Sequence, residues 1–207
     1  MECKNEFETL YMEQGYKQVI GIDEAGRGPL AGPLVVAGVC FPKGFSHPDI
    51  YDSKKVGEKK REVLFDYIQE HALYFKIEII DEATIDRLNI YEATKQTMMK
   101  IARECEIADV ILSDAMKFQI EGKVVEPIVK GDQKSVNIAA ASILAKVTRD
   151  RIMKAYSETY PEYGFDKNKG YPTKQHLQAL ETYGVLPIHR RSYAPVAKAL
   201  QMHFDFK

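Results

Sequence analysis

The segment Val19-Ile-Gly-Ile-Asp-Glu-Ala-Gly-Arg-Gly28 joins a short apolar run to two adjacent carboxylates and a glycine-flanked arginine. The apolar run predicts a strand over Val19–Asp23, because short hydrophobic runs bounded by glycine are typical of buried strands. In a regular strand, neighbouring side chains point to opposite faces, so Asp23 and Glu24 reach one site only if the strand ends or twists at Glu24. Ala25-Gly26 favours such a bend, since glycine adopts backbone angles that other residues avoid.

The charges in this segment indicate two kinds of ligand. Adjacent carboxylates at a strand end suit a divalent cation, and a Gly-Arg-Gly turn suits a nucleic-acid backbone. The turn is not a P-loop, since no Gly-Lys-Ser/Thr follows it, and its glycines miss the dinucleotide-binding spacing. A plainer interpretation stays open, in which Asp23 caps a turn and Glu24 is solvated. The segment favours metal-dependent chemistry on a phosphodiester.

Outward from this segment, hydrophobic periodicity predicts strands that alternate with helices. The further strands are expected at Leu34–Phe41, Tyr74–Ile80, Val110–Ser113 and Val124–Val129. The helices are expected at residues 2–14, Lys59–His71, Asp81–Leu88, Ile90–Glu104, Asn137–Thr159, Thr173–Tyr183 and Pro195–His203, with an irregular stretch over Pro161–Pro172. Strands first, then strands alternating with helices, predict a mixed sheet with helices on both faces.

The composition bounds the class of protein. With 207 residues, 45% of them hydrophobic, the chain is long enough to bury a proper core. We expect an N-terminal polar segment over residues 1–17, an α/β domain over 18–160 and a C-terminal helical lobe over 161–207. The polar, acidic start predicts no signal peptide, and no apolar run is long enough to span a membrane.

Cysteine usage and charge favour a cytoplasmic protein with an anionic partner. Cys3, Cys40 and Cys105 are odd in number and far apart, as expected of reduced thiols in a cytosolic protein. The net charge is −1 at pH 7, yet acidic residues predominate up to residue 145 and basic ones after it. That asymmetry fits a metal site in one part and nucleic-acid contacts in the other, although it is weak evidence alone.

Two further acids share the placement of Asp23. Asp114 follows the apolar run Val110–Ser113, and Asp132 follows Pro127–Lys130. Because ligands of α/β sheets gather at strand ends, these acids and Glu24 can meet in one place. Four carboxylates repel one another unless they surround hard divalent cations, and oxygen-only ligation favours Mg²⁺ or Mn²⁺ over Zn²⁺.

Alternatives to this carboxylate set stay open. Each acid alone is more often a turn residue, and only their joint occurrence favours a metal site. Asp150 is a competing fourth ligand. It lies mid-helix between Arg149 and Arg151, where ion pairing is the simpler explanation, so it ranks below Asp132.

A set of motifs in one order gives a resemblance to a known family. They are Gly21-Ile-Asp-Glu-Ala-Gly-Arg-Gly-Pro-Leu-Ala-Gly-Pro33, Asp52-Ser-Lys-Lys55, Leu112-Ser-Asp-Ala115, Lys130-Gly-Asp132, Ala141-Ser-Ile-Leu-Ala-Lys-Val-Thr-Arg-Asp150, Lys169-Gly-Tyr-Pro-Thr173 and His189-Arg-Arg-Ser192. Together these motifs resemble bacterial ribonuclease HII, of the type 2 RNase H family, over residues 18–200. The Gly-Arg-Gly turn looks like type HII rather than type HIII. Ser113-Asp114-Ala115 departs mildly from the family pattern.

The resemblance implies a fold and an activity. The fold would be α/β and RNase H-like, with a central five-stranded mixed sheet flanked by helices and a small C-terminal helical lobe. The activity would be that of an endoribonuclease acting on the RNA strand of RNA/DNA hybrids and cutting 5′ of single ribonucleotides embedded in duplex DNA. Such an enzyme serves ribonucleotide and primer removal in DNA repair and replication. A two-metal mechanism would leave a 3′-hydroxyl and a 5′-phosphate.

The resemblance also implies roles for individual residues. Asp23, Glu24, Asp114 and Asp132 would be catalytic and hold two divalent ions, Mg²⁺ or Mn²⁺, with Asp23 between them. The turn Gly26-Arg27-Gly28 would contact the ribonucleotide 2′-OH and the junction backbone, and Tyr171 would stack on the next deoxyribose.

Fewer observations support the roles of the remaining residues. Phosphate contacts are expected from Lys54, Lys55, Lys146 and Lys169, for which a solvated surface is an equal alternative. His176 and His189 lack zinc-site spacing and are interpreted as structural or surface residues. Arg190 and Arg191 are expected to brace the C-terminal lobe.

Two rival functions and one partner remain as hypotheses. The rivals are another nuclease of the same fold, such as a Holliday-junction resolvase or an integrase-type nuclease, and a non-catalytic RNA/DNA-hybrid binding module. The partner is a sliding clamp, because Gln201 and Met202–Lys207, with Phe204 and Phe206, faintly resemble clamp-docking peptides. The alternative is that this tail folds back onto the C-terminal helix.

Overall fold

A mixed sheet is the centre of the fold. The structure, a computed structural model, describes residues 5–204, with side chains to residue 201. Within that range five strands pair in the order β3-β2-β1-β4-β5. They are β1 (Val19–Ala25), β2 (Leu34–Cys40), β3 (Tyr74–Ile80), β4 (Val110–Asp114) and β5 (Val124–Ile128). β1 pairs antiparallel with β2 and parallel with β4, and β4 pairs parallel with β5. This confirms the predicted five-stranded mixed sheet.

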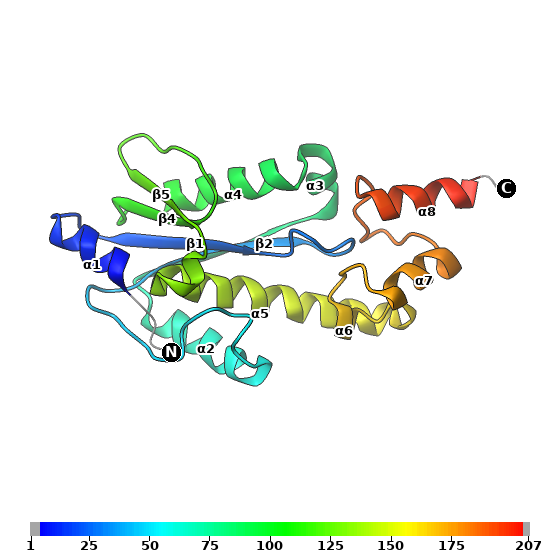
Figure 1. Cartoon of the computed structure of the whole chain (residues 1–207), viewed down its shortest axis with the longest axis horizontal. Coiled ribbons are helices and arrows are strands. Elements are labelled where there is room, and N and C mark those ends of the chain that lie inside the picture. The colour runs from blue at the N-terminus through cyan, green and yellow to red at the C-terminus, as the bar shows by residue number, and fades with distance from the viewer. Residues whose placement is uncertain (1–4, 205–207) are drawn as a thin grey trace. The chain divides into compact units, whose positions relative to one another are not determined.

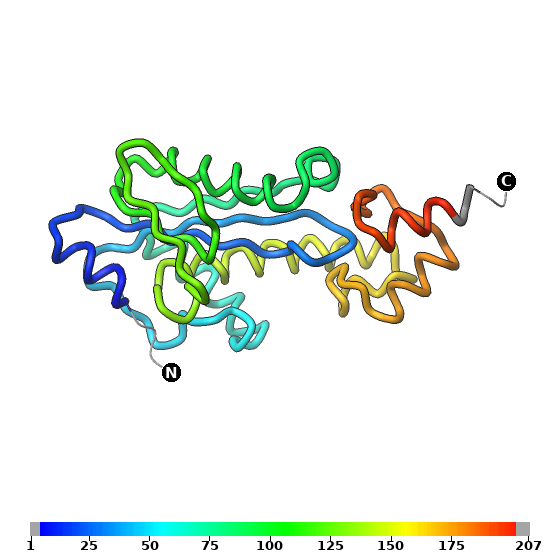
Figure 2. The backbone as a smooth tube through the Cα atoms, turned by 45° about the horizontal axis from the view of Figure 1, so that its top comes forward, coloured from blue at the N-terminus to red at the C-terminus, as the bar shows by residue number. Residues whose placement is uncertain are grey.

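Helices cover both faces of the sheet. They are α1 (Glu6–Glu13), α2 (Glu58–His71), α3 (Glu82–Leu88), α4 (Ile90–Glu104), α5 (Val136–Thr159), α6 (Phe165–Asn168), α7 (Lys174–Tyr183) and α8 (Ala194–Phe204), with 3-10 turns η1 (Gly131–Gln133) and η2 (Pro161–Tyr163). Figures 1 and 2 show α2 and the first part of α5 on one face and α4 on the other. The stretch Pro161–Pro172, predicted to be irregular, contains η2 and α6. None of the described helices has the length and apolar character to cross a membrane.

The chain divides into two compact units that are interleaved in sequence. The first contains the described residues up to Ala25, Val35–Glu78 and Thr94–Val147. The second contains Gly26–Leu34, Ile79–Ala93 and the described residues from Thr148 onward. The predicted boundary near residue 160 stays a prediction.

The core of the first unit depends on the close approach of α5 to the sheet. Ala139, Ala140 and Ala141 of α5 are fully buried beside the valines of β2. On β1, a Cβ atom added to Gly21 would lie 2.2 Å from the Ile138 nitrogen and 2.3 Å from the Asn137 carbonyl carbon. Backbone atoms cannot move aside as a flexible side chain does. Gly21 is therefore required by the distance between β1 and α5.

Substitution of Gly21 tests this contact. Gly21→Ala is expected to lower the free energy of unfolding by at least about 1–3 kcal/mol, the usual cost of overpacking a core. Gly57→Ala is the matched control, because an added Cβ there meets nothing within 4 Å; Gly57 is the N-cap of α2 and has no side-chain cap to lose, so we expect this substitution to lower the free energy of unfolding by less than about 1 kcal/mol. Urea unfolding of both variants checks the prediction. Equal stability of the two would show that α5 does not press on β1.

Glu8 fixes α1 to the start of α5. Its side chain is buried, and Oε1 accepts hydrogen bonds from the Ser135 hydroxyl (2.5 Å) and the Asn137 backbone N–H (3.1 Å). The Asn137 side chain in turn donates to the Val19 carbonyl (2.7 Å). Burial raises the pKa of Glu8. The N-terminal helix, which was predicted as a polar helix with no assigned contact, thus anchors the first turn of the helix that packs on β1.

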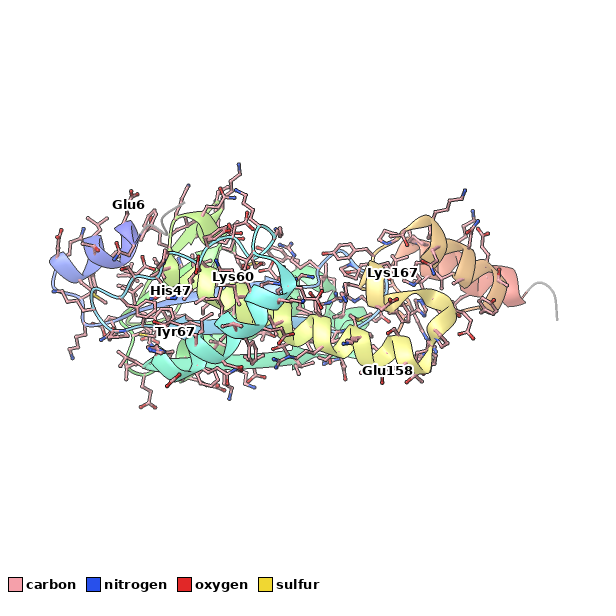
Figure 3. The ribbon with its side chains drawn as sticks, turned by 90° about the horizontal axis from the view of Figure 1, so that it is seen from below. Glu6, His47, Lys60, Tyr67, Glu158 and Lys167 are labelled. Atoms are coloured by element: carbon pink, nitrogen blue, oxygen red, sulfur yellow. The ribbon has the colours of Figure 1, made fainter. Side chains whose placement is uncertain are left out.

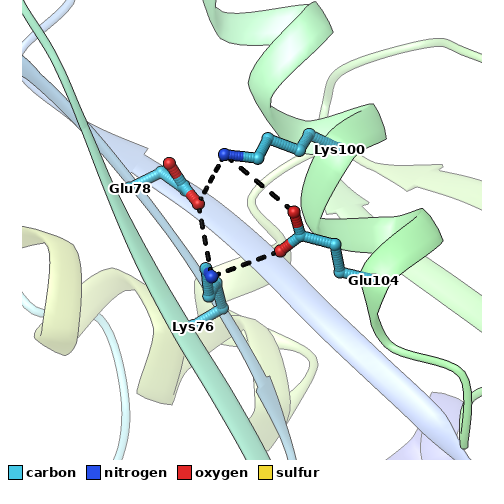
Figure 4. Close-up of polar contacts among 4 residues, drawn as sticks. All are labelled: Lys76, Glu78, Lys100 and Glu104. Atoms are coloured by element: carbon cyan, nitrogen blue, oxygen red, sulfur yellow. Dashed lines mark hydrogen bonds and ion pairs between the residues drawn. The ribbon is translucent and has the colours of Figure 1, made fainter.

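Alternating charges cover the edge strand β3. Lys76 lies 3.6 Å from Glu78 and 3.3 Å from Glu104, and Lys100 lies 2.9 Å from Glu78 (Figure 4). These side chains link β3 to α4 and place charge along an outer strand. Charged side chains at such a position oppose pairing with a foreign strand. Each exposed pair contributes only about 0–1 kcal/mol to stability.

The second unit has its own core. Leu30 and Ala31 of the segment after β1 are buried with Met153 of α5 and with aromatic residues of the helical segments. These aromatic residues are Tyr163 of η2 and Phe165 of α6, whose rings stack 5.5 Å apart. The core therefore joins the segment that follows the Gly26-Arg27-Gly28 turn to α6, α7 and α8, which Figure 1 shows beside it.

Candidate active site and substrate-binding turn

Asp23 and Glu24 lie inside β1. The predicted strand end at Asp23 is wrong, because β1 continues to Ala25 and pairs Asp23 with Ala37 and Glu24 with Val36 of β2. Asp23 is buried and Glu24 is partly exposed. Asp23 Oδ1 accepts the Glu24 backbone N–H (2.7 Å), and the Ser142 hydroxyl also hydrogen bonds to Asp23. The pairing of β1 with β2 thus keeps the Asp23 backbone in the sheet.

Asp114 and Asp132 belong to the ends of β4 and β5, the two strands that follow β1 in the order of the sheet. Asp114 is the last residue of β4, as predicted, and its Oδ1 accepts the Gly131 backbone N–H (2.9 Å). Asp132 lies in η1, four residues after the end of β5, and is buried. Lys130 enters that turn in the left-handed conformation (φ 58°). The strand predicted to reach Val129 ends at Ile128, and the turn carries Asp132 instead.

The acids of the first unit raise one another's pKa. Burial, and then repulsion by Glu24 and Asp114, holds the pKa of Asp23 well above its ordinary value. Burial, followed by Asp52 and Asp114, raises the pKa of Asp132 to about 6. Lys54 opposes that shift. Unpaired carboxylates close enough to repel are unfavourable without a cation. The sequence-predicted acids of this unit therefore influence one another, and the predicted Lys54 lies within electrostatic range of Asp132.

Asp52 is a fifth acid, which the sequence reasoning did not place in the site. It is buried, its Oδ1 accepts the Lys54 backbone N–H (3.0 Å), and its Oδ2 accepts the Gln133 side-chain amide (3.3 Å). The Lys55 ammonium lies 3.8 Å from Oδ2. The motif Asp52-Ser-Lys-Lys55 contributed to the family resemblance, but no chemical role was assigned to its aspartate from the sequence.

The loop that carries Lys54 and Lys55 is anchored on both sides. Ser53 Oγ lies 2.7 Å from Ser142 Oγ of α5. Toward α2, the His47 ring packs against Tyr67 at 4.7 Å, and Lys60 pairs with Asp49 at 2.6 Å (Figure 3). These contacts fix the backbone while the two lysine side chains remain exposed. Lysine ammonium groups on a fixed loop suit contacts to phosphate.

The donor set matches a hard divalent cation in its chemistry. It consists of carboxylate oxygens, and the raised pKa values of Asp23 and Asp132 mean that their ionised forms are disfavoured, which a bound cation would reverse. Across the described residues, no three His, Cys, Asp or Glu side chains stand in a metal-holding arrangement. Asp114 Oδ1, for example, is engaged by the Gly131 N–H. Ligation therefore requires the carboxylates to reorient.

In the second unit, Arg190 holds the Gly26-Arg27-Gly28 turn. Its guanidinium is fully buried and donates to the carbonyls of Gly26 (2.7 Å), Gly32 (2.8 and 3.0 Å) and Arg27 (3.2 Å). The Tyr193 hydroxyl also donates to the Arg27 carbonyl (2.7 Å). The sequence predicted only a brace for the C-terminal lobe. Arg190 instead fixes the backbone of the turn, while the Arg27 side chain is exposed.

Arg149 holds the segment that follows the Gly26-Arg27-Gly28 turn. It is buried and donates to the carbonyls of Pro33 (3.0 Å), Ala31 (3.0 Å) and Lys169 (2.9 Å). Burial lowers the pKa of Arg149 to about 10. A Cβ atom at Gly26, where φ is 102°, would lie 2.2 Å from Arg149 Nε. Two buried guanidiniums satisfied by carbonyls thus make the turn rigid.

Tyr171 stands beside this turn. The residue is 46% exposed, and a Cβ atom at Gly28 would lie 3.3 Å from Tyr171 Cε1. The Leu30 backbone N–H donates to the Gly170 carbonyl (2.8 Å), so the two loops are hydrogen-bonded. The second unit therefore presents a rigid glycine turn with an exposed aromatic ring against it.

The remaining predicted residues are distributed over both units. Lys146 is partly exposed on the part of α5 in the first unit. Lys169 precedes Tyr171, and its ammonium donates to the Asp166 carbonyl (2.6 Å). Asp150, the alternative acid, is buried in the part of α5 in the second unit. The Phe204 side chain and residues 205–207, on which the clamp hypothesis rests, lie outside the described residues.

Comparison with known proteins gives one family. The family model described as Ribonuclease HII matches residues 20–196. A ribonuclease HII of Acholeplasma laidlawii is 50% identical over 196 residues, covering 94% of this chain and 96% of the relative. The solved ribonuclease H2 from Pyrococcus horikoshii is 25% identical with a TM-score of 0.75, over 89% of this chain and 98% of that one. A Bst-RNase HIII solved in complex with Mn²⁺ shares the fold at 18% identity, TM-score 0.60, over 89% and 70%.

Proposed function

The chain belongs to the ribonuclease HII family, so it is a type 2 ribonuclease H and a hydrolase, and on that premise we propose its substrate and mechanism. It hydrolyses the RNA strand of RNA/DNA hybrids and cuts on the 5′ side of single ribonucleotides embedded in duplex DNA. The observation that carries this proposal is the gathering of carboxylates on neighbouring strands, where Asp114 accepts the Gly131 N–H beside Asp132 and where burial, followed by mutual repulsion, raises the pKa of Asp23 and Asp132. The rigid turn with Tyr171 against Gly28 supports recognition of a sugar.

The acids are assigned to metal ligation. Asp23, Glu24, Asp114 and Asp132 would hold two Mg²⁺ or Mn²⁺ ions. When bound, these ions supply Lewis-acid activation of water and neutralise charge at the leaving 3′-oxygen. Asp23 stays oriented for this task by the Glu24 N–H and the Ser142 hydroxyl. Water, and not the 2′-OH, is the attacking group, so the products carry a 3′-hydroxyl and a 5′-phosphate.

The turn and its neighbours are assigned to the substrate. The 2′-OH is what distinguishes a ribonucleotide from its DNA neighbours, so selectivity requires contacts to it. Backbone groups of Gly26–Gly28 approach a sugar closely because no Cβ intervenes, and Arg27 contacts the junction backbone. Tyr171 stacks on the following deoxyribose. Lys54, Lys55, Lys146 and Lys169 contact phosphates along the duplex.

Cellular roles follow from this chemistry. Removal of embedded ribonucleotides and of RNA primers would place the protein in DNA repair and replication in the cytoplasm. A weak contact between the C-terminal tail and a sliding clamp also remains a proposal, supported by the tail sequence alone.

A substrate panel tests the proposed function. The panel contains a continuous RNA/DNA hybrid, a DNA duplex with one ribonucleotide and an all-DNA duplex of the same sequence. With Mg²⁺ we expect the first two to be cut and the third to remain intact, and we expect chelation to stop cleavage. Cleavage of the all-DNA duplex at a similar rate would contradict the proposal and favour another nuclease of the same fold.

A further inference from the structure

Two histidines form a buried hydrogen-bonded pair behind Tyr171. His176 of α7 and His189 are 0% and 1% exposed, and their Nε2 atoms lie 3.0 Å apart. His176 Nδ1 lies 3.0 Å from the Tyr171 carbonyl oxygen. His189 Nδ1 lies 2.9 Å from the Leu186 backbone nitrogen. Each ring nitrogen of the pair therefore has one partner, and this pairing was not predicted from the sequence.

The partners assign the protons without ambiguity. The Leu186 N–H can only donate, so His189 Nδ1 accepts and carries no proton. The proton of a neutral His189 is then on Nε2, which donates to His176 Nε2. The proton of a neutral His176 is consequently on Nδ1, which donates to the Tyr171 carbonyl. The hydrogen bonds therefore all run in one direction, from the Leu186 N–H through His189 and His176 to the Tyr171 carbonyl. We call this chain of hydrogen bonds the relay.

The relay tolerates no additional proton. Protonation of His176 at Nε2 would set two N–H groups against each other, and protonation of His189 at Nδ1 would oppose the Leu186 N–H. The rings that pack against the pair are Tyr163 and Phe165, and Tyr183 packs against Tyr163. Burial, reinforced by His176, lowers the pKa of His189 to about 4, and burial lowers the pKa of His176. Both rings are thus kept neutral at physiological pH.

The relay ends on the backbone that orients Tyr171. The Tyr171 N–H donates to the Asn168 carbonyl (2.9 Å), and the Tyr171 carbonyl accepts the Thr173 N–H (2.8 Å) in addition to His176. Both peptide groups that flank Tyr171 are therefore held, while its ring is exposed. An exposed ring takes its direction mainly from its backbone, because packing restrains it on one side only.

We propose that His176 and His189 are positioning residues, whose relay fixes the Tyr171 backbone so that its ring meets the sugar that follows a single ribonucleotide. This inference rests on the function proposed above for Tyr171. The pair acts through Tyr171 and does not contact the substrate. Its effect should therefore be larger on a single-ribonucleotide junction than on a continuous hybrid.

The relay itself is tested by nitrogen NMR on the full-length wild-type protein, which needs no variant. We expect His176 to carry its proton on Nδ1 and His189 on Nε2, with neither ring titrating between about pH 8 and about pH 5.5, below the ordinary histidine pKa. The opposite tautomer of either ring, or protonation within that range, overturns the proposal.

The positioning role is tested by His176→Phe, which keeps a ring and removes the donor to Tyr171. Tyr163→Phe is the matched control, because it removes a buried hydrogen bond from the same cluster, the one to the Gly184 carbonyl (2.7 Å), and leaves the relay atoms in place. For His176→Phe we expect kcat on a single-ribonucleotide duplex to fall by about tenfold or more, as for a displaced positioning group, and the ratio to hybrid cleavage to fall with it. Tyr163→Phe should leave that ratio unchanged.

The outcomes separate this inference from the proposed function. An equal loss on both substrates by His176→Phe, or the same ratio change in Tyr163→Phe, would mean that the pair only supports the lobe. If wild type fails to cut the single-ribonucleotide duplex, the proposed function falls. In that case the relay is still tested by the NMR chemical shift of the Tyr171 carbonyl carbon, compared between wild type and His176→Phe. An unchanged chemical shift would overturn the inference that the relay holds this backbone.

Discussion

Asp23→Asn is expected to abolish cleavage and to make the cation-free protein more stable. An amide keeps the oxygen that accepts the Glu24 N–H, so the local fold should persist. Loss of the negative charge removes a proposed ligand of the divalent cation. Since such ions supply several kcal/mol of transition-state stabilisation, we expect turnover to fall by about 10³-fold or more. Single-turnover cleavage of a continuous hybrid in Mg²⁺ measures this loss.

The stability gain has a defined pH dependence. The pKa of Asp23 is raised in the folded protein, so this group contributes stability below its unfolded pKa, and that contribution is lost as pH rises through the folded value. Without cations, Asp23→Asn should therefore be more stable than wild type near neutral pH, by about 1–3 kcal/mol, and the difference should vanish in acid. Thermal unfolding in chelator at several pH values checks it.

Two results would contradict this account of Asp23. Near-normal turnover by Asp23→Asn would remove it from the site, and reduced stability in chelator would show that its charge is compensated within the protein. Asp132→Asn is the parallel test for the fourth acid. If that variant retained activity, Asp150 would become the residue to test.

Tyr171→Ala is expected to impair cleavage of a single embedded ribonucleotide by about 10- to 100-fold, while Tyr171→Phe retains most activity. Stacking on an aromatic ring contributes about 1–3 kcal/mol, and about 1.4 kcal/mol corresponds to a tenfold change in rate. The loss should be smaller on a continuous hybrid, because the ring is proposed to sense the deoxyribose at the junction. Initial rates on both duplexes measure the difference.

A second tyrosine serves as the control for surface truncation. Tyr91 is 45% exposed, nearly the same as Tyr171 at 46%, and also belongs to the second unit. Tyr91→Ala should leave both activities unchanged. If Tyr171→Ala matched Tyr91→Ala on both substrates, Tyr171 would have no role in recognition.

The sequence predicted the sheet and the helices because their signals are local. Val110–Ser113 is a short apolar run that ends at an acid, as is typical of a buried strand, and the start of α5 is rich in alanine, the strongest helix former. The end of β1 was missed because its last residues, Glu24 and Ala25, have no strand propensity of their own. Their pairing with Val36 and Val35 keeps them in the strand, and that partner is distant in sequence. Tertiary pairing overrode local preference.

The supports of the candidate site were harder to predict. Arg149, Arg190 and Glu8 have charged side chains, which a sequence alone places at the surface, yet all three are buried and bonded to backbone or hydroxyl groups. The His176–His189 pair joins residues whose spacing carries no motif. Such contacts depend on where loops fold back, which local pattern does not encode. The acids that we propose as metal ligands were named from the sequence, whereas the groups that hold the turn were found only in the structure.

The most direct test of the central claim is the position and chemistry of the cut. A duplex with one ribonucleotide, labelled in turn at either end of that strand, is incubated with Mg²⁺ and resolved on a denaturing gel beside markers with defined ends. The account predicts one cut at the phosphodiester on the 5′ side of the ribonucleotide, leaving a 3′-hydroxyl on the DNA and a 5′-phosphate on the ribonucleotide. A cut on its 3′ side that leaves a cyclic phosphate, and persists in chelator, would contradict it.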